Sequence, residues 1–331
     1  MAFSKKLYIT LKDTIMKRIA ITGAGGYIGQ ALIKYLDEYD GCDAILGIDL
    51  KKPKRHSSRL TFIEKDIRDA SLLNDIKNFK VDTLIHLAFV VNPMHNESEM
   101  FSINVDGTIN ILDICSHQGI GHIIVASSGT AYGAWPDNPV PLTENHPIRI
   151  FPASFSYAYH KGLNEKHFHS FKQKHPDVLF NIVRPCIVYG PNTDNYLYRY
   201  WKTFPFIPLI DGYDADFQFV HETDVASLFT LLIEKQIDGA FNVAGDGAIK
   251  VSEVAKMMGK PAFYFPKWML KSIIWLGWHA RFIFEMPPGT VDFSTYPWIL
   301  DTQKAKKLLG WQPQYSTRET IEIMYKSKGV I

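Results

Sequence analysis

Short runs of β-branched and aliphatic residues alternate with longer amphipathic stretches from Met16 to about residue 185. Such alternation predicts a parallel sheet with helices on both faces, which is a doubly wound α/β domain. The runs that indicate strands are residues 18–22, 44–49, 60–64, 83–88, 122–127 and 180–185. The stretches with helical length and apolar spacing are residues 27–39, 99–118 and 154–175.

The pattern changes after Gly190. Aromatic segments interrupted by prolines follow, with less regular spacing, before two further predicted helices at 223–235 and 251–258. We therefore expect a smaller lobe in this part of the chain, facing a substrate. Residues 241–245 have the pattern of one more strand, so the chain is expected to return to the large sheet.

These features divide the chain into three parts. Residues 1–15 are expected to form an N-terminal extension, because they lack the apolar stretch of a secretory signal. Residues 16–190 are expected to form the larger domain, which residues 219–245 rejoin. Residues 191–331 are expected to form mainly the smaller, substrate-binding lobe.

Composition and charge narrow the classes of function. The chain has 331 residues, 46% of them hydrophobic, and a formal net charge of +2 with basic and acidic residues interspersed. Because no long basic run is present in the sequence, we expect a small-molecule substrate and not a nucleic acid. Cys42, Cys115 and Cys186 have no CxxC spacing, which favours reduced thiols in a cytoplasmic protein.

The most lipophilic stretch covers residues 266–284. Lys271, His279 and Arg281 interrupt it, so it is too short to span a bilayer and we expect no stable membrane insertion. Its few basic residues on a distinct polar face also argue against a helix lying on a membrane surface. We expect its aromatic side chains to pack against the sheet or to form an apolar lid over the substrate. These side chains are Trp268, Trp275, Trp278, Phe282 and Phe284.

A glycine-rich turn follows the first predicted strand. Residues 22–29 read TGAGGYIG and place Gly23, Gly26 and Gly29 between this strand and the first predicted helix. Glycines allow a tight turn and let a pyrophosphate approach main-chain N–H groups at the positive end of a helix. At the start of an α/β domain, the turn therefore predicts a dinucleotide site.

Asp49 ends the second predicted strand, 20 residues beyond Gly29. A carboxylate there can accept hydrogen bonds from the ribose hydroxyls of adenosine, which favours NAD. Four basic residues follow and could neutralise a 2′-phosphate, so NADP remains an alternative. They are Lys51, Lys52, Lys54 and Arg55.

Candidate catalytic residues occupy two later segments. Ser128 follows a predicted strand, and Tyr157 and Lys161 lie four residues apart, on one face of a predicted helix. A tyrosine in water loses its proton near pH 10, and we expect the ammonium of Lys161 to lower the pKa of Tyr157 towards the working pH. Lys161 could also hold the nicotinamide ribose. Ser128 would donate a hydrogen bond to the substrate oxygen as charge develops on it.

These motifs, in this order, resemble the extended short-chain dehydrogenase/reductase family, also called the NAD-dependent epimerase/dehydratase family, from Arg18 to about Pro313. Besides the glycine turn, Asp49 and the pair Asp66–Ile67, seven segments carry the resemblance. They are HLAF (86–89), NVDGT (104–108), SSGTAYG (127–133), YAYHK (157–161), RPCIVYGP (184–191), FVHETDVA (219–226) and DTQKAKKLLGWQP (301–313).

The resemblance implies a Rossmann-like fold, an NAD cofactor and a homodimer in which the helices at 99–118 and 154–175 pair. It also implies further cofactor contacts. Asp66 and Ile67 would touch adenine, and Asn104 would brace the cofactor cleft. The residues that would line this cleft or face the nicotinamide are Tyr27, Ile28, Leu87, Ala88, Phe89, Lys161 and Pro185.

Departures from the family pattern narrow the activity. Sugar dehydratases of this family carry an Asp-Glu pair where this chain has Gly129 and Thr130, so dehydration is disfavoured. Nucleotide-sugar epimerases typically carry Asn and Arg where this chain has Ile187 and Phe217, neither of which can bind a diphosphate. Arg199, Lys202 or another basic group would have to replace them.

Three hypotheses follow for the function. The leading one is an oxidoreductase that moves hydride between NAD and a secondary alcohol or ketone, with an apolar substrate. The alternative is a nucleotide-sugar epimerase with tightly bound NAD, which would use the same groups. A remote third is a non-enzymatic module that senses the ratio of NAD to NADH. No metal site is predicted, because the histidines of the helix at 154–175 have no matching acids or cysteines.

Overall fold

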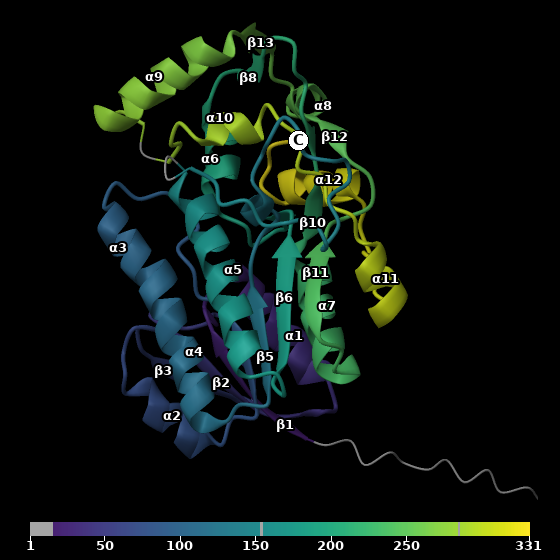
Figure 1. Cartoon of the computed structure of the whole chain (residues 1–331). Helices are drawn as coiled ribbons and strands as arrows, with labels where there is room; N and C mark the ends of the chain where they lie inside the picture. Colours follow the sequence, from purple (N-terminus) through teal and green to yellow (C-terminus); the bar gives the residue numbers. More distant parts are fainter. Residues whose placement is uncertain (1–15, 153–154, 284) are drawn as a thin grey trace, which may run out of the picture.

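A seven-stranded parallel sheet forms the centre of the protein (Figure 1). The computed structural model describes residues 16–152, 155–283 and 285–331, so the expected extension at 1–15 lies outside the described residues. The strand order is β3-β2-β1-β4-β5-β6-β11. The strands are β1 (Lys17–Thr22), β2 (Cys42–Asp49), β3 (Leu60–Glu64), β4 (Thr83–His86), β5 (His122–Ala126), β6 (Leu179–Pro185) and β11 (Gly239–Val243).

Every strand expected in the larger domain is present, and the expected return of the chain occurs at β11. This strand pairs in parallel with β6, with Phe241 opposite Val183. The strand expected at 83–88 ends earlier, at His86. Leu87 N still donates to Thr22 O of β1 at 3.0 Å, and the chain leaves the sheet after this bond.

Helices cover both faces of the sheet, as a doubly wound fold requires. On one face, α1 (Tyr27–Glu38) packs against α7 (Glu222–Lys235) over a core that includes Leu32 and Leu228. On the other face, α2 (Leu72–Phe79), α4 (Gly107–Gln118) and α5 (Ser156–Lys174) bury a second core that includes Ile111 and Phe168. The fold is therefore the Rossmann-like α/β architecture that the alternation of the sequence predicted.

A smaller lobe caps the carboxyl edge of the sheet (Figure 1). Three two-stranded pairs belong to it, namely β7 (Ile187–Tyr189) with β10 (Phe219–His221), β8 (Ile207–Ile210) with β13 (Ala262–Phe265), and β9 (Asp216–Phe217) with β12 (Ile249–Lys250). The helices after β6, apart from α7, are α6 (Tyr196–Thr203), α8 (Val251–Met257), α9 (Lys267–His279), α10 (Thr290–Phe293), α11 (Gln303–Leu309) and α12 (Thr317–Ser327). None of the described helices is both long enough and apolar enough to cross a lipid bilayer.

A buried ion pair fixes α5 to the sheet. The guanidinium of Arg184 in β6 donates to both carboxylate oxygens of Glu165 in α5, at 2.9 and 3.0 Å. The two side chains are only 3% and 1% exposed. Arg184 also donates to the hydroxyl of Tyr132 at 2.7 Å, and this hydroxyl donates to Asn242 of β11. Each partner in this network therefore compensates a polar group that water does not reach.

We predict that Arg184→Met lowers the free energy of unfolding by about 3–5 kcal/mol, because the substitution leaves the carboxylate of Glu165 buried without its partner. The matched control is Lys250→Met, which breaks an ion pair with Asp216 whose side chains are 43% and 45% exposed. This control should lower the free energy of unfolding by about 1 kcal/mol or less. Chemical denaturation of both variants checks the difference, and equal losses would contradict a structural role for the buried pair.

Candidate active site

A cavity lies between the carboxyl edge of the sheet and the smaller lobe. From the sheet side, residues that follow β5 and end β6 line it, together with one face of α5. From the lobe, α6, α9 and α10 contribute side chains. This is the edge at which ligands bind in open parallel sheets, since the loops after the strands converge there.

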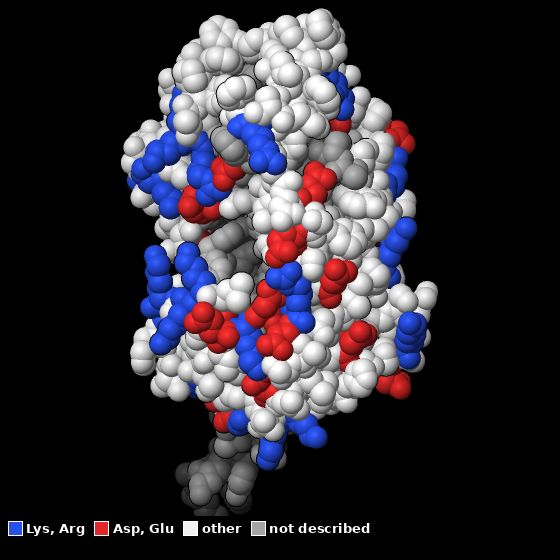
Figure 2. All heavy atoms as spheres, turned by 90° about the vertical axis from the view of Figure 1, so that its left-hand side faces the viewer, with Lys and Arg blue, Asp and Glu red and all other residues white. Residues whose placement is uncertain are grey.

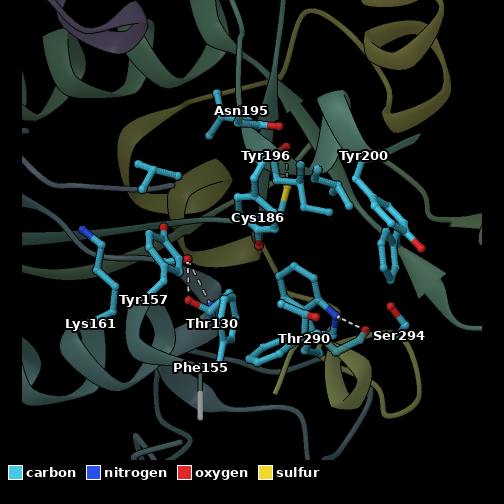
Figure 3. A pocket seen from close by; sticks show the side chains of 18 of the residues that line it. Thr130, Phe155, Tyr157, Lys161, Cys186, Asn195, Tyr196, Tyr200, Thr290 and Ser294 are labelled. Atoms are coloured by element: carbon cyan, nitrogen blue, oxygen red, sulfur yellow. Dashed lines mark hydrogen bonds between the residues drawn. The ribbon is translucent and has the colours of Figure 1, made fainter. Parts of the chain in front are cut away.

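Ser128, Tyr157 and Lys161 all line this cavity. Ser128 follows β5, and its Oγ accepts hydrogen bonds from the main-chain N–H and the hydroxyl of Thr130, at 3.1 and 2.9 Å. Tyr157 and Lys161 lie in the first turns of α5, on the same side of the cavity (Figure 3). The helical spacing that the sequence indicated thus brings the tyrosine and the lysine to one site.

The ammonium of Lys161 is buried. Its Nζ donates to Ala126 O at 2.7 Å and lies 3.6 Å from the centroid of the Phe89 ring. The Phe89 ring also meets the Tyr157 ring edge to face, with 5.4 Å between the centroids and an angle of 88° between the planes. Phe89 therefore lies against both polar side chains of α5 and separates them from water on that side.

The pKa values differ from the expectation. Burial raises the pKa of Tyr157, and a hydrogen bond with Ser128 only partly opposes this effect. Burial lowers the pKa of Lys161 to about 7, against the opposing effect of Glu165. The expectation that the pKa of Tyr157 falls towards the working pH is therefore wrong for this arrangement. Burial outweighs the opposing effects, and the Nζ of Lys161 bonds Ala126 O and lies 6.0 Å from the centroid of the tyrosine ring.

The glycine turn connects β1 to α1 as the sequence predicted. Gly23 has φ +76°, and a Cβ there would lie 2.6 Å from Ala88 N. A Cβ on Gly29 would lie 2.4 Å from Gly23 O. Gly26 caps α1 without a side chain, which leaves the N–H groups of the first turn for an anion. The turn therefore fits the pyrophosphate of a dinucleotide.

Asp49 lies at the carboxyl end of β2, next to this turn. Its carboxylate accepts hydrogen bonds from Gly25 N at 2.9 Å and Lys51 N at 3.0 Å, which orient it beside the glycines. This is the position from which a carboxylate can hold ribose hydroxyls. The basic side chains that follow Asp49 are exposed, and they are Lys51, Lys52, Lys54 and Arg55.

The residues expected near adenine lie beyond β3. The carboxylate of Asp66 pairs with the guanidinium of Arg68 at 3.0 and 2.7 Å, and this pairing lowers the pKa of Asp66. Ile67 is buried, and its carbonyl accepts a hydrogen bond from Asn110. Neither residue lines the cavity, so any contact with a cofactor would lie at the outer end of an extended cleft.

Asn104 braces the loop after β4. Its Oδ1 accepts from Val90 N at 2.7 Å, and its Nδ2 donates to Val90 O at 3.1 Å. It lies in a π-helical turn, Ser102–Asp106, between α3 (Glu97–Phe101) and α4, within the single helix that was expected at 99–118. Such wide turns are frequent at functional sites. The sequence did not indicate this irregularity.

The expected site residues thus fall into two groups. One group lines the cavity, and it comprises Tyr27, Ile28, Leu87, Phe89, Ser128, Tyr157, Lys161 and Pro185. The other group surrounds the glycine turn and its neighbouring strand ends, and it comprises Gly23, Gly26, Gly29, Asp49, Asp66, Ile67, Ala88 and Asn104.

Sequence reasoning missed most of the lobe side of the cavity. Ile187 and Phe217, already noted as departures, line it, and Cys186 lies near its centre (Figure 3). Further side chains from the lobe are Asn195, Tyr196, Leu197, Tyr200, Trp201, Leu270, Ile274, Met286, Thr290, Val291, Phe293, Ser294 and Trp298. The only signal for any of them was the helical spacing of Leu270 and Ile274.

Charge is almost absent from the cavity. Among the described residues that line it, Lys161 alone carries a charged side chain. Arg199, one of the basic residues that could have replaced a diphosphate ligand, instead pairs with Glu285 and Asp194. Lys202 is exposed and does not line the cavity. A bound diphosphate would therefore lack compensating charge.

The aromatic helix differs from the expectation. Of its tryptophans, only Trp278 is buried, whereas Trp268 and Trp275 are exposed, as is Phe282 just beyond the helix. Phe284 lies outside the described residues. These aromatic side chains therefore do not all pack inward or close over the cavity. Leu270 and Ile274, on the opposite face of the helix, line the cavity instead.

The sequence of the chain matches a known protein family and individual relatives. The model of the NAD dependent epimerase/dehydratase family matches residues 19–244. A putative UDP-glucose 4-epimerase of Methanocaldococcus jannaschii is 28% identical over 320 residues, which cover 92% of this chain and 96% of that protein.

Solved structures agree in fold. UDP-glucose 4-epimerase from Thermotoga maritima, with UDP-glucose, gives a TM-score of 0.74 at 20% identity, covering 94% of this chain and 98% of that one. The dTDP-glucose 4,6-dehydratase from Bacillus anthracis, in complex with NAD, gives a TM-score of 0.72 at 18% identity. The match covers 95% of this chain and 96% of that one. Because the family model extends from β1 to just past the end of β11, the chain belongs to the NAD dependent epimerase/dehydratase family.

Proposed function

We propose that this protein is an oxidoreductase that transfers hydride between NAD and a secondary alcohol or ketone with an apolar frame. One observation carries the proposal. Ser128, Tyr157 and Lys161 meet at one end of a cavity whose remaining described lining carries no charged side chain. Three groups that can act on one reacting oxygen, in a cavity whose other polar side chains are uncharged, suit a substrate that has such an oxygen and a largely hydrocarbon body.

Tyr157 exchanges the proton. When an alcohol is oxidised, its carbon loses hydride to the nicotinamide ring of NAD, and its hydroxyl proton passes to Tyr157. In the reverse direction Tyr157 donates its proton to the oxygen of the ketone. Burial raises the pKa of Tyr157, which keeps the phenol protonated and supports its role as a donor.

Ser128 and Lys161 assist this exchange. The hydroxyl of Ser128 donates a hydrogen bond to the substrate oxygen, where negative charge develops during reduction. The ammonium of Lys161 stabilises the phenolate that remains when Tyr157 has donated its proton. Its hydrogen bond to Ala126 O holds Nζ beside the carboxyl end of β5.

NAD is the cofactor, and the residues around the glycine turn fit it. The N–H groups at the start of α1 and the close approach at Gly23 suit a pyrophosphate, and Asp49 suits the ribose hydroxyls. Residues 16–190, with the return at 219–245, form the dinucleotide-binding domain in this proposal. Residues 191–331 supply mainly the substrate lobe. We also expect a homodimer that pairs the helices at 99–118 and 154–175.

The second candidate is a nucleotide-sugar epimerase with tightly bound NAD. The observation that favours it is the similarity to epimerases, including the putative UDP-glucose 4-epimerase. The apolar side chains of Ile187 and Phe217 in the cavity argue against it.

A dehydratase lacks support, because Gly129 and Thr130 offer no carboxylates. A sensor of NAD and NADH would not need a tyrosine and a buried lysine lining an apolar cavity.

The test of the function is turnover of NADH with a panel of apolar cyclic and long-chain ketones, beside UDP-glucose and dTDP-glucose. We expect loss of NADH absorbance with one class of apolar ketone and thermal stabilisation by that class. Stoichiometric NAD retained after purification, with epimerisation of a nucleotide sugar, would overturn the proposal in favour of the second candidate.

Tyr157→Phe should reduce kcat about 10²- to 10⁴-fold, because it removes the proton donor. NAD affinity, measured by calorimetry, should stay within a factor of about three, since the change removes one hydroxyl. The matched control is Tyr159→Phe, on the same helix and outside the cavity lining. Full activity of Tyr157→Phe would exclude this residue as the acid.

The pH profile should report Lys161. Because burial lowers its pKa to about 7, the ammonium is charged below this pH and loses its charge as the pH rises. We expect kcat/KM for ketone reduction to fall above about pH 7, since this ratio follows the unliganded protein. Arginine stays charged in this pH range, so kcat/KM of Lys161→Arg should be lower than that of the wild type but should not fall above about pH 7. A wild-type profile that is flat up to about pH 9 would contradict this assignment.

Asp49→Asn should weaken NAD binding about tenfold, because a charge-assisted hydrogen bond to the ribose becomes a neutral one. NADP binding should weaken less or improve, since the carboxylate no longer repels the 2′-phosphate. The matched control is Asp43→Asn, at the opposite end of β2, where the carboxylate pairs with Arg18. Equal loss of NAD and NADP affinity in Asp49→Asn would argue against the ribose contact.

A further inference from the structure

The helix α9 is apolar on two opposite faces. Its inner face carries Leu270, Ile274 and Trp278, at the spacing of successive turns. Its outer face carries Trp268, Trp275 and Leu276, of which Trp268 is 72% and Leu276 63% exposed. A surface helix normally carries one apolar stripe that faces the core and polar residues on the opposite face, so the outer apolar face of α9 is unusual.

Neighbouring residues extend this outer face. Ile273 lies beside it on α9, and Phe282 follows the helix, both exposed. The preceding strand β13 adds the exposed rings of Phe263 and Tyr264 at the same end of the molecule (Figure 1). We call the exposed apolar residues of α9, with Phe282, the α9 face. Contiguous exposed apolar surface of this kind marks an interaction site.

Basic residues outnumber acidic ones in the segment that carries the α9 face. Between Glu253 and Glu285 the chain carries five basic residues and no acidic residue. Figure 2 shows few charged atoms at this end of the molecule, with Lys and Arg side chains along its margin. The five residues are Lys256, Lys260, Lys267, Lys271 and Arg281. Lys267 and Lys271 both pair with Asp292, which cancels part of this charge.

We infer that the α9 face docks on the surface of an anionic phospholipid membrane. Tryptophan, phenylalanine and leucine enter the boundary between headgroups and acyl chains, and nearby lysine and arginine are attracted to anionic headgroups. The helix lies on the membrane and does not cross it. This inference departs from the expectation that the few basic residues of the segment argue against a membrane-surface helix, because the structure leaves Trp268, Trp275 and Leu276 exposed on one face. A second copy of the chain fits less well, because a two-fold contact would bring the basic residues of one α9 face against those of the other.

Continuity with the cavity adds a second argument. Leu270 and Ile274 line the cavity from the inner face of the helix whose outer face carries Trp268 and Leu276. A membrane in contact with α9 would therefore be one helix thickness away from the apolar cavity. An apolar substrate partitions into a bilayer, and docking at α9 would place the protein where this substrate is concentrated.

Vesicle binding tests the inference without any turnover, so its failure and that of the proposed reaction are distinguishable. The full chain is sedimented with sucrose-loaded vesicles of phosphatidylcholine alone, and of phosphatidylcholine mixed with phosphatidylglycerol. We expect binding to the mixed vesicles, partial release at high salt, and a blue shift of tryptophan emission. No binding to either vesicle, or equal binding to both, would overturn the inference.

Variants locate the docking surface. Leu276→Ser should weaken the partition coefficient for mixed vesicles about tenfold, since it removes an inserted aliphatic side chain. Trp268→Ser should act in the same direction. The matched control is Leu308→Ser on α11, where the leucine is 50% exposed, and it should bind as the wild type does. Equal losses in Leu276→Ser and Leu308→Ser would show that the α9 face is not the docking surface.

Light scattering separates a membrane from a second copy. If the α9 face were an interface between two chains, Leu276→Ser would convert a dimer into a monomer in the absence of lipid. That result would overturn the inference. An unchanged mass together with weaker vesicle binding supports it. Unchanged thermal unfolding of Leu276→Ser is expected, because the side chain is exposed, and it would show that the loss is local.

Discussion

The buried ion pair between Arg184 and Glu165 is the constraint on which the geometry of the site depends. It joins β6 to α5 one helical turn beyond Lys161, so it sets where Tyr157 and Lys161 lie relative to the carboxyl edge of the sheet. Glu165 also opposes the loss of charge that burial imposes on Lys161. The same carboxylate thus compensates a buried guanidinium and supports a buried ammonium. A salt bridge of this kind contributes little net stability, and its value lies in fixing one arrangement of the elements that carry the chemistry.

The low polarity of the cavity gives these few charges their effect. In apolar surroundings an ionic interaction is far stronger than in water, and a charged group without a partner is costly. Phe89 lies against both Lys161 and Tyr157, and the carbonyl of Ala126 accepts one proton of the ammonium. Burial favours the neutral form of each group. It raises the pKa of Tyr157, which keeps the phenol protonated, and it lowers the pKa of Lys161 to about 7.

The sequence predicted the sheet well, because runs such as 18–22 and 122–127 are strongly β-branched and separated by helical stretches. It also predicted that Ser128, Tyr157 and Lys161 come together, and all three line one cavity, since their positions depend on local spacing and on the convergence of strand ends. It failed where orientation depends on tertiary packing. Both faces of α9 are apolar, so periodicity could not tell that Ile274 faces the cavity and Leu276 the solvent. The π-helical turn contains Asn104, whose side chain bonds Val90, 14 residues earlier in the chain, and the periodicity of the sequence does not reveal such a contact. The sign of the pKa shift of Tyr157 depends on how deeply the ring is buried.

Family membership and substrate class rest on different parts of the chain. The turn at Gly23, Asp49 and the pair on α5 lie in the part of the chain that forms the large sheet and its helices, and the family model ends just past β11. The cavity wall comes largely from the lobe, where Ile187 and Phe217 stand and where Arg199 is already paired with Glu285. Burying a diphosphate there would require charge that the wall does not supply, whereas burying a hydrocarbon ring system or chain requires none. The glycine turn and the tyrosine and lysine of α5 lie outside the lobe, so the lobe can define a different substrate without altering them. An apolar wall is therefore compatible with membership in a family whose named relatives act on nucleotide sugars.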